Sequence, residues 1–156
     1  MKTLNPTVLS LGVLAATLSI ATTALALDAA AVEKARSDFF HSLGKPAKGL
    51  RDELQKGTPD LNAVKGYAAD IARIAPNLPA QFPAGSGPES GVKTEAKPNI
   101  WSDPAGFKTD AAGLASAATA LNAAAQGGNI DAIKTAYGNL GQACKTCHTT
   151  YRKEDH

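Results

Sequence analysis

Four stretches of this chain repeat apolar residues at alternating steps of three and four, the spacing of one face of an α-helix. They span residues 32–54, 61–78, 107–125 and 130–151. A mean period near 3.5 residues is typical of long helices that pack almost parallel or antiparallel to one another. No stretch alternates apolar and polar residues as a half-buried strand does. The sequence therefore predicts an all-α fold built from four long helices.

Turn-forming residues separate these stretches. Residues 57–60 (Gly-Thr-Pro-Asp) divide the first two, and we expect Thr58 to be the N-cap of the second helix with Pro59 at its first position. Asp103 before a proline gives the same signal for the third helix, and residues 127–129 (Gly-Gly-Asn) end it and cap the fourth. A Gly-Lys-Pro at 44–46 predicts a kink in the first helix. Short first and last connections predict an antiparallel up-down-up-down four-helix bundle.

The last stretch contains the only two cysteines of the chain, in the string C-x-x-C-H formed by Cys144, Cys147 and His148. Positions three and four apart share one face of a helix. This spacing is the attachment signature of a c-type haem, in which two thiols bond to the porphyrin and the imidazole binds its iron. We therefore predict one covalently attached haem c, with His148 as the metal ligand.

The same string is also compatible with a redox pair, with half of a zinc site, or with chance. A thioredoxin-like pair is typical of a βαβ setting, which this chain lacks. Zinc needs two further ligands, and the remaining histidines, His41 and His156, do not form a second ligand pair.

Residues 1–26 have the pattern of a cleaved secretory signal peptide. Lys2 supplies the positive start, residues 8–20 are apolar, and Ala-Leu-Ala at 24–26 is a small-residue cleavage site. The alternative is a retained membrane anchor, but the apolar run is shorter than the ~20 residues that a span needs. We expect a mature chain of residues 27–156, not membrane-bound, in the bacterial periplasm, because haem c is attached outside the cytoplasm.

Length and charge limit the function classes. The chain has a formal net charge of +2, including Lys2 in the export segment. So small a charge indicates neither nucleic acid nor an anionic membrane as a partner. About 130 mature residues suffice for one domain with one core.

The segment from Pro79 to Asp103 is rich in proline and glycine and contains Phe82 and Trp101. A loop of this length in a compact domain is usually functional or disordered. We expect two short turns against one haem edge, anchored by Phe82 and Trp101. A solvated crossover pinned by Trp101 is the alternative.

From about residue 32 to 155 the chain resembles the cytochrome c prime family. The most specific pieces are residues 35–44, 82–85, 94–101 and 140–152. Most other small c-type cytochromes place the haem string near the start of the chain, and this one does not. The resemblance implies a periplasmic homodimer with high-spin, five-coordinate haem. It also implies that the helices of 32–54 and 61–78 form the dimer surface. Small side chains there, such as Ala68, Ala69 and Ala72, would permit close contact, and the alternative is that these alanines serve only as helix formers.

The resemblance also assigns roles to side chains near the haem. His148 would be the proximal ligand, and Arg152 would be the family's proximal-side arginine, although a surface arginine also suits a helix C-terminus. Arg36 corresponds to an arginine near the haem propionates. Phe40 falls on the position of the bulky apolar residue over the open iron face, which a ligating methionine occupies in the related low-spin branch.

The ligand set can be narrowed further from the sequence. The only methionine is Met1, which would leave with the signal peptide, so the mature protein cannot form a Met/His haem. His41 lies about 100° around the helix from Phe40. If Phe40 faces the iron, His41 therefore faces elsewhere, and five-coordinate iron is the prediction.

An open iron face under Phe40 favours a gas-binding function. Bound oxygen needs a hydrogen-bond donor, whereas nitric oxide and carbon monoxide need it much less. We therefore expect a protein that binds nitric oxide or carbon monoxide. The alternative is a one-electron carrier with a periplasmic partner. An enzyme such as a peroxidase is disfavoured, because Phe40 cannot act as a distal acid or base.

Overall fold

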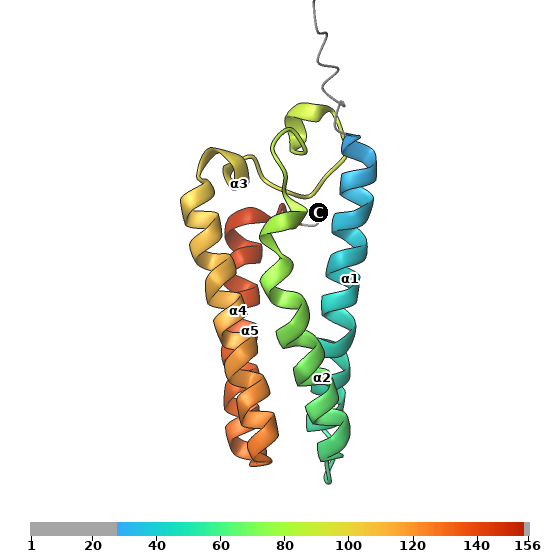
Figure 1. Ribbon diagram of the computed structural model, residues 1–156, viewed down its shortest axis with the longest axis vertical. Coiled ribbons are helices and arrows are strands. Elements are labelled where there is room, and N and C mark those ends of the chain that lie inside the picture. Colours follow the sequence, from blue (N-terminus) through green and yellow to red (C-terminus); the bar gives the residue numbers. More distant parts are fainter. Residues whose placement is uncertain (1–27, 155–156) are drawn as a thin grey trace, which may run out of the picture.

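The computed structural model describes residues 28–154, which form an antiparallel four-helix bundle (Figure 1). Its long helices are α1 (Ala29–Leu54), α2 (Leu61–Ile74), α4 (Pro104–Gly127) and α5 (Ile130–Tyr151). They run alternately down and up, as predicted. The predicted signal peptide lies outside the described residues. None of the described helices is both long enough and apolar enough to cross a lipid bilayer.

The helices pack in sequence around the bundle. α1 packs along α2, α2 along α4 and α4 along α5, whereas α1 and α5 are much less closely packed. Most of the predicted apolar positions form the core, although Leu61 is exposed, and alanine occupies many of them, for example Ala68, Ala111 and Ala118. Ala68 is fully buried within its own bundle, so its predicted place on a dimer surface is wrong.

The predicted helix ends are mostly confirmed. The Asp103 side chain accepts a hydrogen bond from Gly106 N at the start of α4. Gly128 ends that helix with a φ of 74°, in the left-handed region that favours glycine, and Asn129 caps α5.

The predicted cap of α2 is wrong by two residues. Asp60, not Thr58, is the N-cap, and its side chain accepts hydrogen bonds from Asn62 N and Ala63 N. The carboxylate of Glu53 accepts a hydrogen bond from Asp60 N at 2.6 Å. This contact across the turn fixes Asp60 at the start of α2 and leaves Thr58 and Pro59 in the turn.

α1 is one helix through Pro46, and close packing holds it against α2. Gly49 allows this approach, because a Cβ atom there would lie 2.6 Å from Cζ of Tyr67. Tyr137 on α5 donates a hydrogen bond to the carbonyl of Ala47 at 3.1 Å, which ties α5 to α1.

The connection between α2 and α4 crosses one end of the bundle (Figure 1). It contains three single turns of 3₁₀-helix, Ala75–Asn77, Pro79–Gln81 and Pro88–Ser90, and the short helix α3 (Asn99–Ser102). The predicted second helix ran to residue 78, whereas α2 ends at Ile74. Ala75 and Leu78 in the following turns are still buried, so they continue the apolar spacing beyond the α-helix. The connection lies over the end of α5 and the start of α1.

Candidate haem site

A cavity of about 440 Å³ lies at this end of the bundle, between α1, α4, α5 and the connection. α5 contributes both cysteines and His148, and Arg152 follows at its end. α1 contributes Arg36 and Phe40, and the connection contributes Phe82. The remaining lining residues are Glu33, Ser37, His41, Leu43, Gly44, Ala47, Leu78, Thr94, Glu95, Ala96, Ile100, Phe107, Leu114 and Tyr151. The structure thus brings seven of the eight predicted site residues to one cavity.

The two thiols and the imidazole lie on the α5 wall, as the spacing predicts. Cys144 and Cys147 are half-buried, and both are free. Burial is the main cause that raises the pKa of Cys144, and it raises the pKa of Cys147 to about 11, with smaller contributions from Asp110 and Cys144. Reactive redox cysteines have a lowered pKa, so these thiols do not have the electrostatics of a thioredoxin-like pair.

A zinc site also lacks support. Within residues 28–154, no group of three or more Cys, His, Asp or Glu side chains is arranged to hold a metal ion. Within this part of the chain, the two thiols and the imidazole on α5 thus lack the further ligands that a zinc site needs.

His148 lies at the mouth of the cavity, one turn before the end of α5. Partial desolvation of its imidazole, and then the positive charge of Arg152, lower the pKa of His148. The neutral imidazole, which this shift favours, is the form that binds metals. Arg152 is exposed, and its backbone N–H donates to the His148 carbonyl at 3.0 Å. The charge of Arg152 thus acts on His148, and the proximal roles of the two residues stay a prediction.

The α1 and connection walls are aromatic. Phe40 packs edge-on against Phe39 and Phe82, with ring centroids 5.5 Å and 6.3 Å apart. Phe82 also contacts Phe107 at 5.0 Å and Trp101 at 6.0 Å. Trp101 is the predicted site residue that does not line the cavity. Its Nε1 donates to the carbonyl of Pro83 at 2.9 Å, so it supports Phe82 from behind rather than facing a haem edge.

His41, the candidate sixth ligand, is exposed and contributes to the rim of the cavity. Phe40, the preceding residue, is half-buried and packs against the aromatic cluster. The two side chains differ in exposure, but both line the cavity, so the helical offset does not turn His41 away from it as predicted.

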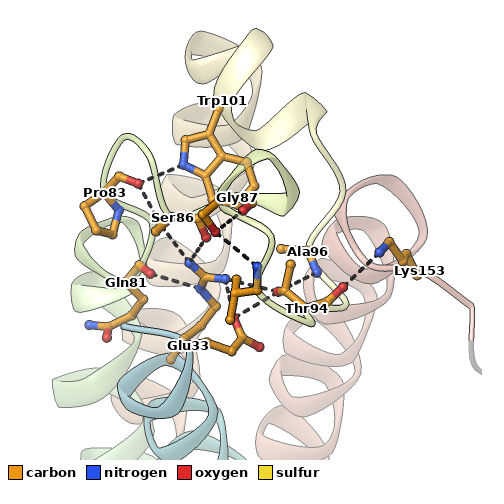
Figure 2. Close-up of polar contacts among 12 residues, drawn as sticks. Glu33, Gln81, Pro83, Ser86, Gly87, Thr94, Ala96, Trp101 and Lys153 are labelled. Atoms are coloured by element: carbon orange, nitrogen blue, oxygen red, sulfur yellow. Dashed lines mark hydrogen bonds and ion pairs between the residues drawn. The ribbon is translucent and has the colours of Figure 1, made fainter. Parts of the chain in front are cut away.

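Arg36 has an environment that the sequence did not predict. Its side chain is only 4% exposed, and its guanidinium lies 4.5 Å from the centre of the Phe82 ring. Figure 2 shows the polar groups around it, including Glu33, Ser86 and Thr94. Nε donates to Gln81 O, Nη1 donates to Glu33 and Thr94, and Nη2 donates to the carbonyl and hydroxyl of Ser86.

A guanidinium has five N–H donors, and these five contacts match that number. Burial lowers the pKa of Arg36, and Glu33 opposes that effect. Arg36 thus lies at the cavity, but its hydrogen bonds hold the connection to α1. A contact with a haem propionate would have to replace one of them.

Comparison with known proteins identifies the family. The family model described as Cytochrome C' matches residues 31–152. The chain belongs to the cytochrome c' family. Cytochrome c' of Pararhodospirillum photometricum is 44% identical over 120 residues, which cover 76% of this chain and 93% of the relative.

Solved cytochrome c' structures share the fold. One, described as having an unusual ligand-controlled dimer dissociation, is 28% identical with a TM-score of 0.74, over 82% of this chain and 98% of the other. A ferrous variant of cytochrome c prime from Alcaligenes xylosoxidans with bound NO is 25% identical with a TM-score of 0.74, over 81% and 97%.

Membership of the cytochrome c' family implies a covalently bound c-type haem. The cavity fits such a group, because two half-buried thiols and an imidazole share one wall and aromatic rings form much of the rest.

Several residues that build the site were not predicted from the sequence. Ser86, Thr94 and Glu33 all accept hydrogen bonds from Arg36. Ser86 and Thr94 lie 50 and 58 positions away in the chain, in irregular backbone, whereas Glu33 precedes Arg36 by three residues on α1 and its helical spacing could have indicated the pair. The segment 94–101 resembles the family closely, but nothing in its composition indicates which groups its side chains bind.

Proposed function

We propose that this protein carries one haem c, bonded to Cys144 and Cys147 with His148 as the proximal ligand, and binds nitric oxide on the side of Phe40. The haem would supply the iron that binds the gas. The observation that carries this proposal is the composition of the cavity: both thiols and the imidazole lie on the α5 wall, and Phe40 and Phe82 lie on the others.

The apolar rings of Phe40 and Phe82 support selectivity for nitric oxide or carbon monoxide over oxygen. Phe40 and Phe82 have no hydrogen-bond donor. The five N–H groups of Arg36 already donate to protein acceptors. Oxygen on haem is stabilised by a donor, whereas nitric oxide depends on one much less. The relative with bound NO supports the same ligand.

We infer further that the protein is not an enzyme and that it acts in the periplasm. Splitting a peroxide needs an acid–base group on the distal side, and a phenyl ring cannot transfer protons. Cytochrome c' proteins are generally periplasmic, which agrees with the signal peptide predicted for residues 1–26.

A homodimer through α1 and α2 is part of the proposal. Ala69 is exposed and Ala72 half-buried, so the outer face of α2 has small side chains that permit close approach. The solved relative with ligand-controlled dimer dissociation shows that a protein of this fold can form a dimer.

Gas titration of the purified haem-loaded protein tests the proposal. We expect the absorption spectrum of the ferrous protein to change with nitric oxide and with carbon monoxide, and to stay unchanged in oxygen until the iron slowly oxidises. A spectrum that is indifferent to all three gases would contradict the proposal and favour the electron-transfer alternative.

A further inference from the structure

The segment 94–99, named the strap, covers the end of α5. Its backbone pairs with the last residue of that helix and with the chain just after it: Lys97 N donates to Tyr151 O and Lys153 N donates to Glu95 O, both at 2.8 Å. Two strap side chains add to this pairing. Lys97 Nζ donates to Thr149 O at 2.9 Å, and Asn99 Nδ2 donates to Thr150 O at 3.1 Å.

These contacts satisfy the last carbonyls of α5. The final four carbonyls of a helix have no partner within it, and helix ends without partners fray. In α5 the His148 carbonyl accepts from Arg152 N, and the strap supplies donors for Thr149, Thr150 and Tyr151. A cation such as the Lys97 ammonium is also favourable at a helix C-terminus. The capped turn is the one that directly follows His148.

The other end of the strap is held by α1 and by the chain after α5. Thr94 Oγ1 donates to Glu33 at 2.9 Å and accepts from Arg36 at 3.2 Å. The Thr94 carbonyl accepts from Lys153 Nζ at 2.9 Å, a contact drawn in Figure 2. The strap therefore connects the end of α5 to the buried Arg36 network. Because its other end is fixed in this way, the strap stays in place when the last turn of α5 frays.

We propose that Lys97 and Asn99 are positioning residues for His148: by capping the carbonyls after it, they hold its turn of α5 in the helix and set how readily the imidazole leaves the iron. This inference rests on the proposed function, in which His148 is the proximal ligand. With haem bound, a stronger cap would hold the turn of His148 more firmly and so would favour retention of the imidazole when a gas binds.

Lys97→Met in the haem-loaded protein tests the inference. It removes the Nζ donor and leaves the backbone bond from Lys97 N to Tyr151 in place, so the strap still pairs with the chain. Lys97→Arg restores a cationic donor, and Lys134→Met makes the same charge change at an exposed position of α5 far from its end.

Two measurements are needed. The first is hydrogen exchange at the Arg152 amide, which reports closure of the last turn, and the second is the iron–histidine stretching frequency of the ferrous protein without gas. We expect Lys97→Met to speed exchange by about threefold to tenfold, the effect of one hydrogen bond, and to lower the stretching frequency. Lys97→Arg and Lys134→Met should match the wild type.

The inference is overturned if Lys97→Met leaves the stretching frequency at the wild-type value, whether or not exchange changes, because the cap would then be only structural. Neither measurement uses nitric oxide. A protein that fails to bind the gas would therefore contradict the proposed function and leave this test intact.

Discussion

Phe40 and Arg36 are four residues apart on α1 and both line the cavity, yet their contacts give them different roles. Phe40 contacts other aromatic rings and presents no polar group. Arg36 is buried and its donors bind four other residues of the protein. We therefore expect Phe40 to control access to the iron and Arg36 to control the stability of the connection.

Replacing Phe40 with alanine should open the space over the iron. We expect carbon monoxide affinity to rise on the order of tenfold, because one bulky group in an apolar pocket has effects of that size. Flash photolysis of the carbon monoxide complex measures the rate constants. Phe39→Ala is the matched control, since Phe39 is adjacent and does not line the cavity. Equal effects of the two variants would contradict the role given to Phe40.

Arg36→Met should destabilise the fold. The carbonyls of Gln81 and Ser86 and the hydroxyl of Thr94 would lose a buried donor, and we expect a cost of about 3 kcal/mol. Unfolding of the protein in guanidinium chloride measures this loss of free energy of unfolding. The control is Lys34→Met, two residues before Arg36 in the chain. It removes an exposed ion pair between Lys34 and Asp38 and should cost about 0.5 kcal/mol or less. If the Arg36 variant were as stable as the Lys34 variant, the buried network would not hold the connection.

At the scale of elements, two contacts fix α1 against α2. Gly49 lets the ring of Tyr67 approach the α1 backbone. At the turn, the buried carboxylate of Glu53 accepts from Asp60 N and pairs with Lys56 at 2.5 Å. Neither contact is part of the cavity, so changes to them should alter stability and leave the haem spectrum unchanged.

Gly49→Ala and Gly113→Ala should have opposite effects. Alanine in a helix normally stabilises it by about 1 kcal/mol relative to glycine, and nothing lies within 4 Å of a Cβ at Gly113. At Gly49 the added carbon meets the Tyr67 ring, and overpacking of this kind costs about 1–3 kcal/mol. Thermal unfolding compares the two. A melting temperature that rises for Gly49→Ala would show that Tyr67 moves aside without cost.

Glu53 predicts a specific acid sensitivity. Hydrogen bonds from Lys56 and then from Asp60 N lower the pKa of Glu53 from its ordinary value of 4.5. A carboxylate with a lowered pKa in the folded state contributes stability at neutral pH, and this contribution is lost as the pH falls below 4.5. Glu53→Gln should therefore be less stable at neutral pH and lose less stability in acid.

Urea midpoints measured from neutral pH down through this range check the prediction. Lys56→Met removes the larger cause of the shift and should reduce the acid dependence as well. If the urea midpoints of both variants fell with pH as steeply as those of the wild type, the acid sensitivity would not come from Glu53.

At the scale of the whole molecule, the bundle is closely packed except between α1 and α5, and the cavity lies there. An apolar group that fills this space would join α1, α5 and the connection. We therefore expect a variant without haem, Cys144→Ser with Cys147→Ser, to unfold at a lower temperature than the haem-loaded protein, because unfilled apolar space is destabilising. Calorimetry of both forms measures this, and equal melting temperatures would contradict it.

Much of this arrangement could be predicted from local sequence. The four helices follow from periodic apolar residues, and the haem donors follow from the spacing of Cys144, Cys147 and His148 on one helix face. The cap of α2 could not be predicted, since Thr58 and Asp60 are both good N-caps and Glu53 decides between them across the turn. The Arg36 network joins α1 to irregular backbone, where no periodic pattern records which groups meet.

The spin state of the ferric haem-loaded protein is the sharpest test of an open iron site. Electron paramagnetic resonance at low temperature should show a high-spin signal, because His148 is the only axial ligand that we assign and Phe40 occupies the other side of the cavity. A low-spin signal from the resting protein would mean that a sixth ligand, such as His41 at the cavity rim, binds the iron, and it would contradict gas binding at an open site.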